Sequence, residues 1–463
     1  MPAPDLPTTP AEKRKTSPLE EETNTDTPNV DSEEDSDSDV APPPAKRGRI
    51  AQEQDTGPAG LFLDTVNRYM LDFDFEKLCS VSLSNLNVYA CLVYILPDGY
   101  EVTDSSLNDI KYVLQPTFTS EQVANLDKHL PQAYDLNNKA YMPGFVGLNN
   151  IKQNDYVNVI IQSLAHITPL RNYFLLDRSE NGSELVKRFG TLIRKIWNTR
   201  AFKGQVSPHE LLQEISNSSQ KRFRLSEQAD VIDFLSWFLN ALHLGMGGTR
   251  KKSSVIHDIF QGEVKVESQT IIVREDEQGK RKVFDESREI TTKRSPFMFL
   301  TLDLPPPPLF QDEAEKNIIP QIALTTLLSK YDGVTGQESG STLRRYKITK
   351  LPRYLVFHIK RFTKNNWAQE KNPTIVNFPI KNVDMRDYVE GVDPDAPTKY
   401  DLVANIIHEG GSRSIEGNYK VHVHCKAKDQ WLQIQDLFVE EIMPQMIFLS
   451  ESYLQVWERK DDA

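Results

Sequence analysis

Few residues of this chain could act as a sulfur nucleophile or as a thiolate metal ligand. Its 463 residues include only three cysteines, Cys79, Cys91 and Cys425. Cys425 follows His422 and His424, and a neighbouring imidazole can take the proton from a thiol. The segment has a strand-like pattern, however, so both histidines lie on one face and Cys425 lies on the other. We therefore interpret Cys425 as a packed residue, which is a common role for a free cysteine.

A richer pattern is spread over the second half of the chain, where six segments follow one another. They are residues 147–158 (GLNNIKQNDYVN), 227–235 (EQADVIDFL), 260–262 (FQG), 351–362 (LPRYL to KRF), 400–419 (YDL, HEG and GNY) and 431–436 (WLQIQD). In this order they resemble the cysteine box, the glutamine-box helix, a sheet segment, the L-P-x-x-L to K-R-F strand, the histidine box and the closing strand of ubiquitin-specific proteases. This resemblance covers about residues 143–460. It implies a papain-like α+β fold shaped as a hand, with a helical thumb and a β-rich palm and fingers, and ubiquitin as the substrate class.

The same resemblance assigns three residues to the positions of the catalytic triad. Asp155 stands at the nucleophile position, Asn418 at the base position and Gln435 at the orienting position. A carboxylate is a poor nucleophile toward an isopeptide, and it adds negative charge where an oxyanion develops. The Asn418 amide cannot accept a proton near neutral pH, although an amide such as that of Gln435 can fill the orienting role.

The position that helps to bind the oxyanion has also changed. Gln153 replaces an asparagine there, and its longer side chain should misplace the hydrogen-bond donor. With each triad position altered as well, we predict that the chain is a pseudo-deubiquitinase with no catalytic residues.

The altered cysteine box resembles one branch of the family. The run from Asn149 to Tyr156 is similar to that of inactive family members that act as splicing factors associated with the spliceosomal tri-snRNP. Further segments that resemble this branch are residues 61–79, 89–91, 169–174, 236–243 and 371–379. The resemblance implies a nuclear scaffold that supports tri-snRNP assembly or maintenance, with tri-snRNP proteins as its partners.

One part of the chain departs from that branch. There a zinc finger of the ubiquitin-protease type begins at the positions of Cys79 and Cys91, and further Cys and His ligands follow. Here Cys91 runs almost directly into the Tyr94–Glu101 segment, so the middle of the finger is missing. Two cysteines cannot supply the four ligands of a structural zinc site, and the sequence has no C-x-x-C pair that could form a zinc ribbon in the fingers. We therefore expect no zinc and no other cofactor.

The elements that must position the proposed triad residues lie in the last of four predicted parts of the chain. These are a disordered acidic tail with a basic cluster (1–57), the zinc-finger remnant (58–115), a linker with a helix (116–142) and the protease-like domain (143–460). The tail is rich in Pro, Ser, Thr, Asp and Glu, and such a segment buries too little apolar area to offset its ordering entropy. In the linker, Ser120 is the expected N-cap of the helix.

Within the last part, helical patterns dominate as far as His243 and strand-like patterns follow. Among the expected strands are Val255–Ser268 and Tyr354–Ile359. The charged or Gly-rich stretches 276–294 and 312–341 predict exposed loops. Helices followed by strands within one block favour an α+β fold whose halves pack together.

The charge of the chain restricts its partners. The formal net charge is −12 and the pI is about 5.4. This argues against a broad basic surface for nucleic acid, so we expect contact with RNA to be indirect. Lys46, Arg47 and Arg49 form a short basic cluster that predicts nuclear import. The sequence shows no apolar run of the ~20 residues that span a bilayer, no secretory h-region and no disulfide framework. We therefore expect a soluble protein of the nucleus.

Two other functions stay open at this point. The palm could still bind ubiquitin or a ubiquitin-like protein without cutting it, because a binding surface can outlast catalysis. An active deubiquitinase of the cysteine type would need a different nucleophile, and the changes at the triad positions oppose it. The splicing scaffold is the function that the sequence favours.

Overall fold

The computed structural model describes part of the chain. The described residues are 116–135, 138–176, 182–201, 203–270, 272–275, 282–285, 289–306, 319–364 and 369–460. The predicted tail, its cluster of Lys46, Arg47 and Arg49, and the finger remnant with Cys79 and Cys91 lie outside these ranges. The four predicted domain limits therefore stay predictions. Among the described residues, no helix is both long enough and apolar enough to span a membrane.

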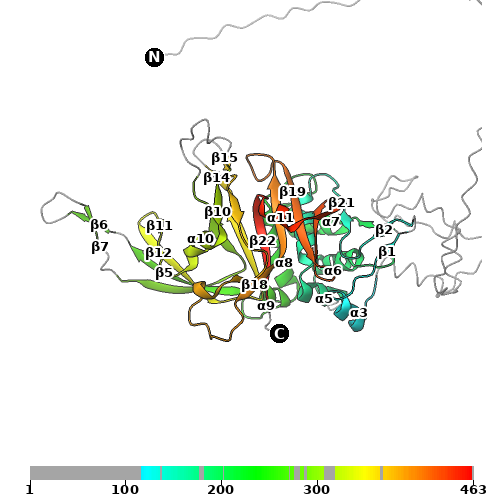
Figure 1. Ribbon diagram of the computed structural model, residues 1–463, viewed down its shortest axis with the longest axis horizontal. Helices are drawn as coiled ribbons and strands as arrows, with labels where there is room; N and C mark the ends of the chain where they lie inside the picture. Colours follow the sequence, from blue (N-terminus) through cyan, green and yellow to red (C-terminus); the bar gives the residue numbers. More distant parts are fainter. Residues whose placement is uncertain are drawn as a thin grey trace, which may run out of the picture. The chain divides into compact units, whose positions relative to one another are not determined.

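An eight-stranded sheet forms the centre of the fold (Figure 1). Its strands run in the order β21 (Phe438–Ile442), β20 (Gln430–Gln435), β19 (Asn418–Cys425), β18 (Lys399–Glu409), β22 (Ser452–Arg459), β13 (Tyr354–Lys360) and β9 (Leu300–Asp303), and β17 (Val383–Asp384) pairs with β18. The β13–β9 pair is parallel and the other pairs of this sheet are antiparallel. Strand β18 buries every residue from Leu402 to His408. A strand buried at consecutive positions must be covered on both faces of its sheet.

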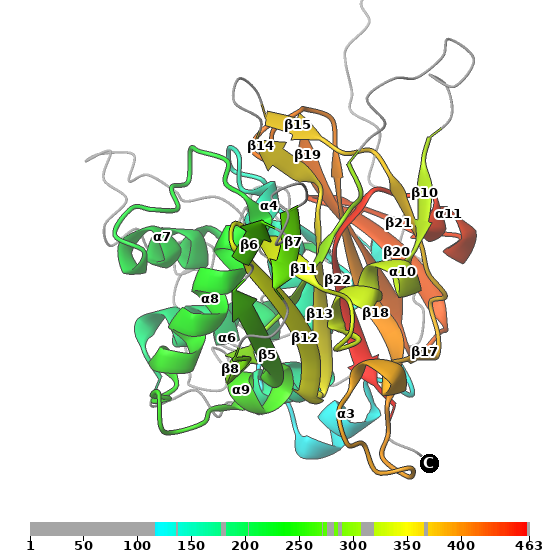
Figure 2. The same cartoon turned by 90° about the vertical axis from the view of Figure 1, so that its left-hand side faces the viewer.

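Helices cover one face of this sheet, as Figure 2 shows to the left of the strands. They are α4 (Asp155–Ala165), α5 (Thr168–Leu175), α6 (Glu184–Ile196), α7 (His209–Ser218), α8 (Val231–Gly245) and α9 (Val255–Phe260). All eleven residues of α4 are buried. A helix that is buried all round lies in the interior of its domain, so α4 is the central helix of this layer.

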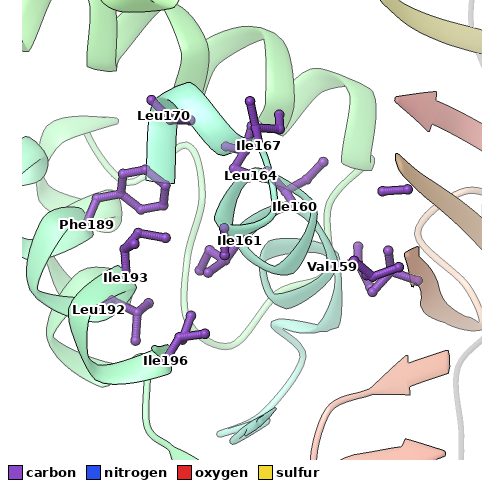
Figure 3. Close-up of a cluster of buried hydrophobic side chains, with 14 of the residues drawn as sticks. Val159, Ile160, Ile161, Leu164, Ile167, Leu170, Phe189, Leu192, Ile193 and Ile196 are labelled. Carbon is purple, nitrogen blue, oxygen red and sulfur yellow. The ribbon is translucent and has the colours of Figure 1, made fainter. Parts of the chain in front are cut away.

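The packing around α4 is apolar on both of its sides. Figure 3 shows Ile161 of α4 directed toward Ile193 and Ile196 of α6, and Val159 on the opposite side of α4, toward the strands. Each of these four side chains is at most 2% exposed. Burying an aliphatic side chain of this size contributes roughly 1.5–3 kcal/mol. These contacts fix the position of α4, which begins at Asp155.

A second core covers the other face of the sheet. It contains buried residues of α10 (Leu324–Leu328), the 3-10 turn η2 (Ser329–Tyr331) and α11 (Pro444–Phe448). A separate four-stranded sheet, in the order β11 (Gln337–Ser339), β12 (Thr342–Lys350), β5 (Gly262–Thr270) and β8 (Thr291–Phe297), extends to the left in Figure 1. Two cores on opposite faces of one sheet, with a second sheet beside them, confirm the predicted α+β class.

Short elements complete the described chain. The strand pairs are β1 (Ala133–Tyr134) with β2 (Ala140–Tyr141), β3 (Gly147–Leu148) with β4 (Gln205–Val206), β6 (Ile272–Glu275) with β7 (Lys282–Asp285), β10 (Gln321–Ala323) with β16 (Ile375–Asn377), and β14 (Phe362–Lys364) with β15 (Gln369–Lys371). The remaining elements are helix α3 (Ser120–Asn125) and the 3-10 turn η3 (Arg386–Tyr388).

Several expected elements differ from those in the structure. The predicted strand Tyr354–Ile359 is confirmed as β13, but the first part of the predicted strand Val255–Ser268 is the helix α9. Its buried residues Ile256, Ile259 and Phe260 have helical spacing, which a short apolar run does not distinguish from a strand. The expected loops were also wrong in part, because β7 and the first residues of β8 lie in 276–294 and α10 lies in 312–341.

The linker is attached to the helical layer by an ion pair. Helix α3 begins after Thr119, not Ser120 as predicted, and Thr119 forms a capping box with Gln122. Beyond the helix, Asp127 accepts two hydrogen bonds from Arg171 of α5, at 2.6 and 2.9 Å, and the guanidinium lies 4.7 Å from the ring centroid of Trp197. Burial alone would raise the pKa of Asp127, but the hydrogen bonds and charge of Arg171 bring it below its usual value of 3.8.

Replacement of Asp127 should therefore weaken the fold in a pH-dependent way. Asp127→Asn leaves Arg171, which is 2% exposed, without its counterion. Because Asp127 itself is 30% exposed, we expect a loss of roughly 1–3 kcal/mol, less than for a fully buried pair. The lowered pKa means that the ionised carboxylate stabilises the fold above the unfolded pKa. The difference from wild type should be full at pH 7 and shrink below about pH 4.

Urea unfolding curves at several pH values would measure this difference. The matched control is Glu184→Gln, which removes an exposed ion pair with Arg188 and should change stability by at most about 1 kcal/mol. Equal stability of Asp127→Asn and wild type at pH 7 would contradict the assignment.

Candidate functional site

Asparagine side chains hold the loop that leads into α4. Asn154 is 1% exposed, and its Oδ1 accepts a hydrogen bond from the Ile151 N–H at 2.7 Å. Its Nδ2 donates to Oδ1 of Asn158 at 3.1 Å, and Asn158 Nδ2 donates to the backbone oxygen of Asn149 at 3.3 Å. Buried amides that both donate and accept have little freedom to reorient. This network fixes the backbone immediately before Asp155.

The carboxylate of Asp155 accepts hydrogen bonds from three separate parts of the chain. Its Oδ1 accepts from the Tyr156 N–H at 2.9 Å and from Gln228 Nε2 at 3.0 Å. Its Oδ2 accepts from the Tyr419 N–H at 2.9 Å and from Gln228 Nε2 at 3.1 Å. Burial raises the pKa of Asp155 and so does the nearby charge of Asp436, whereas the hydrogen bonds oppose this rise. Both oxygens of this 4%-exposed side chain are therefore engaged by protein donors.

A second carboxylate joins the sheet to α4. Asp436 follows β20, and its oxygens accept from Nδ2 of Asn158 at 2.8 Å and from Nδ2 of Asn150 at 3.0 Å. Asp436 has a φ of +49°, a conformation that short polar residues tolerate better than most. Its neighbour Leu437 lies so close to Gly147 that a Cβ at Gly147 would be 2.6 Å from the Leu437 Cα. A glycine at this position lets the loop approach the sheet and brings Asp436 within reach of α4.

The residues predicted at the triad and oxyanion positions meet at this end of α4. Asn418 is the first residue of β19, paired with Glu409, and its side chain is exposed. Gln435 is the last residue of β20 and is half-buried, and Gln153 is exposed in the loop before α4. The contact between β19 and α4 is made by the backbone of Tyr419, next to Asn418. The site therefore offers a carboxylate that is already hydrogen-bonded, beside exposed amides.

The cysteine considered for catalysis lies elsewhere in the sheet. Cys425 is 1% exposed at the end of β19, and burial raises the pKa of its thiol, which disfavours the thiolate. His422 is also buried, its Nε2 lies 3.1 Å from Oε1 of Gln433, and burial lowers its pKa to about 4. This environment suits packing more than nucleophilic chemistry. Within the described ranges, no group of three or more His, Cys, Asp or Glu residues could hold a metal ion.

Two residues of this site were not singled out from the sequence. Gln228 lies before α8, in the segment predicted to be the glutamine-box helix, and donates to Asp155 and to the Gly417 oxygen. Asp436 follows Gln435 directly. Each residue lies within or at the end of a matched motif, which is a signal for its importance. The hydrogen-bond partners of these two residues, however, depend on distances between segments in the folded chain, and the sequence does not give those distances.

The profile of the family described as "Ubiquitin carboxyl-terminal hydrolase" matches residues 146–457. The chain belongs to this family. A solved structure from the same family fold, the Ubp8 subunit of "the SAGA Ubp8/Sgf11/Sus1/Sgf73 DUB module bound to ubiquitin aldehyde", is 18% identical and has a TM-score of 0.53, over 69% of this chain and 70% of that one. At this identity the likeness shows the fold alone. The predicted fold of a ubiquitin-specific protease is thereby confirmed for this chain.

Relatives of this hydrolase-family chain include proteins named for splicing. The "Probable mRNA-splicing protein ubp10" of Schizosaccharomyces pombe is 48% identical over 88% of this chain and 90% of its own length. Human "Ubiquitin carboxyl-terminal hydrolase 39" is 46% identical over 90% of this chain and 83% of its own length. A structure described as "Crystal structure of an essential yeast splicing factor" is 26% identical with a TM-score of 0.66, over 87% of this chain and all of that chain.

The alignments also show that these relatives contain residues that this hydrolase-family chain lacks. The human alignment spans 474 positions, whereas 90% of 463 residues is only about 417. About 57 aligned positions of the human protein therefore have no counterpart here. For the S. pombe protein, 456 aligned positions face about 407 residues, which leaves about 49.

The geometry predicts a structural role for Asp155. Asp155→Ala removes the acceptor for the buried Tyr419 N–H, and a buried donor left unsatisfied is unfavourable by roughly 1–3 kcal/mol. Gln228 Nε2 is half-buried and keeps the Gly417 oxygen as an acceptor. We expect a loss of about 1–3 kcal/mol in the free energy of unfolding. Gln153→Ala, an exposed position two residues earlier, should stay within about 0.5 kcal/mol of wild type. Chemical denaturation of both variants tests this, and equal midpoints for the two would disprove the role.

Proposed function

We propose that this chain is a non-catalytic scaffold of nuclear pre-mRNA splicing, which supports the assembly or maintenance of the tri-snRNP. The observation that carries the non-catalytic part is the state of the Asp155 carboxylate. Its oxygens accept from Tyr419, Tyr156 and Gln228, so the residue at the proposed nucleophile position is held as an internal hydrogen-bond acceptor. The names of the S. pombe relative and of the yeast structure support the splicing part.

The chemistry at the other proposed positions agrees with this. A nucleophile in this fold needs a base within hydrogen-bond reach that can take its proton. Asn418 stands at that place, and an amide does not accept a proton at neutral pH. Gln435 could orient an imidazole, but the proposed base position holds the amide of Asn418.

Affinity purification tests the scaffold. The tagged full-length chain, isolated from nuclear extract with and without RNase, should recover tri-snRNP proteins, as mass spectrometry can show. Recovery that survives RNase would place the contacts on protein, as the net charge of −12 suggests. Recovery of ubiquitin conjugates without splicing proteins would instead support a ubiquitin receptor and overturn the proposal.

Hydrolysis of a fluorogenic ubiquitin C-terminal amide tests the absence of catalysis. We expect no turnover by the wild-type chain and none by Asp155→Cys, because the new thiol would have Asn418 rather than a base beside it. Turnover by the wild type that is lost in Cys425→Ser would show that another thiol had taken over.

We further propose that residues 58–115 are a remnant that binds no zinc. The presence of Cys79 and Cys91 as the only cysteines of this part supports this. Elemental analysis of protein purified without chelator should give far less than one zinc ion per chain. A stoichiometric zinc content would refute this, and a Cys79→Ser variant would then show whether this segment holds the ion.

A further inference from the structure

Large apolar side chains are concentrated at one edge of the eight-stranded sheet. The segment 437–449, here called the β21 surface, includes five whose exposed fractions lie between 46 and 78%: Leu437, Phe438, Met443, Met446 and Leu449. The rest of the described chain exposes only six more large apolar side chains to a similar extent. Single exposed apolar residues are ordinary, but a concentration of them in one short segment marks an interaction surface.

The backbone of β21 is available on one side. Among the described strands, β21 pairs only with β20 and ends the sheet (Figure 2). The ladder runs from Phe438 opposite Gln435 to Ile442 opposite Trp431 without a register shift. An antiparallel edge strand directs alternate N–H and C=O groups away from its neighbour. A regular edge without a bulge is a suitable template for one more strand.

The charge of this edge indicates what kind of strand would fit. Residues 429–458 contain six acidic residues and no Lys or Arg. Glu440 and Glu441 lie on opposite faces of β21 because strand side chains alternate. They accept hydrogen bonds from the neutral amides of Gln433 at 2.6 Å and Gln430 at 3.2 Å. Neither glutamate forms an ion pair with any described residue, so each can still pair with a cation from outside.

We propose that β21 accepts an additional strand from a partner protein, and that this strand is both basic and apolar. Lys or Arg side chains on its two faces would pair with Glu440 and Glu441, since opposite charges on adjacent strands attract. Its apolar side chains would cover Phe438 at the start of β21 and Met443 just beyond its end. The alternative is that no partner binds this edge. The two glutamates would then prevent it from pairing with strands of other protein molecules.

This proposal rests on the proposed scaffold function for the source of the partner, which is a protein of the splicing complexes. It adds the surface and the chemistry of the contact.

Photo-crosslinking from a single position tests the surface. A photo-reactive amino acid replaces Phe438, which is 78% exposed, or Val334, a control that is 77% exposed outside this surface. After irradiation of the full-length chain in nuclear extract, the crosslinked peptides are sequenced. We expect the Phe438 position to give one defined segment in which Lys or Arg residues at adjacent positions, one for each face of the strand, are flanked by apolar residues. Its yield should be at least tenfold higher than that from Val334. Backbone amides of β21 should also exchange with deuterium more slowly in the purified complex.

Charge reversal tests the chemistry. Glu440→Lys with Glu441→Lys should lower the crosslink yield at Phe438 at least tenfold. The control, Asp393→Lys with Asp395→Lys, makes the same change of charge at exposed positions elsewhere and should leave the yield unchanged. Equal yields from Phe438 and Val334, an acidic crosslinked segment, or no effect of the Glu440 and Glu441 changes would overturn the proposal. If splicing proteins are still recovered in that case, the scaffold function stands without this surface.

Discussion

The junction between α4 and the sheet depends on one buried carboxylate. Asp155 begins a helix that is buried along its whole length, and apolar packing alone would leave the polar backbone at the start of β19 without a partner. The Tyr419 N–H finds its acceptor in Asp155 Oδ2, and Gln228 closes the contact from a third segment. An unpaired polar group in such a place is unfavourable by an amount comparable to the gain from a good hydrogen bond. The side chain of Asp155 therefore organises the junction between helix α4, the sheet and the segment before α8.

Asp436 links the sheet to α4 from the end of β20. It binds the amides of Asn158 and Asn150, so the loop before α4 is attached to the end of β20 as well as to α4 itself. Burial and the nearby charge of Asp436 both raise the pKa of Asp155. The surrounding N–H and amide donors oppose this rise. The arrangement is a polar network with its hydrogen bonds made, which gives rigidity and requires no reactivity.

The sequence was sufficient for the class of fold, and its motif order predicted which segments meet, but it was insufficient for the contacts between them. Motif order placed Asp155, Asn418 and Gln435 near one another, and the structure brings their three segments to one end of α4. Residues 255–260 could not be assigned, because a short apolar run fits a helix and a strand equally well. The part played by Gln228 could not be foreseen either, because it depends on a side-chain distance across 73 positions of sequence. Periodicity reports which face of an element is buried, but not which polar group meets which across an interface.

The proposed nucleophile position would be difficult to convert to a working nucleophile by one change. A thiol at position 155 is a weak hydrogen-bond acceptor, so it would leave the Tyr419 N–H and the Gln228 amide poorly satisfied. Catalysis needs the nucleophile free and close to a base, whereas the fold needs this position engaged with donors from two other segments. The two demands oppose each other at the same atoms. Selection for stability alone would therefore retain Asp155 at this junction, whether or not ubiquitin binds.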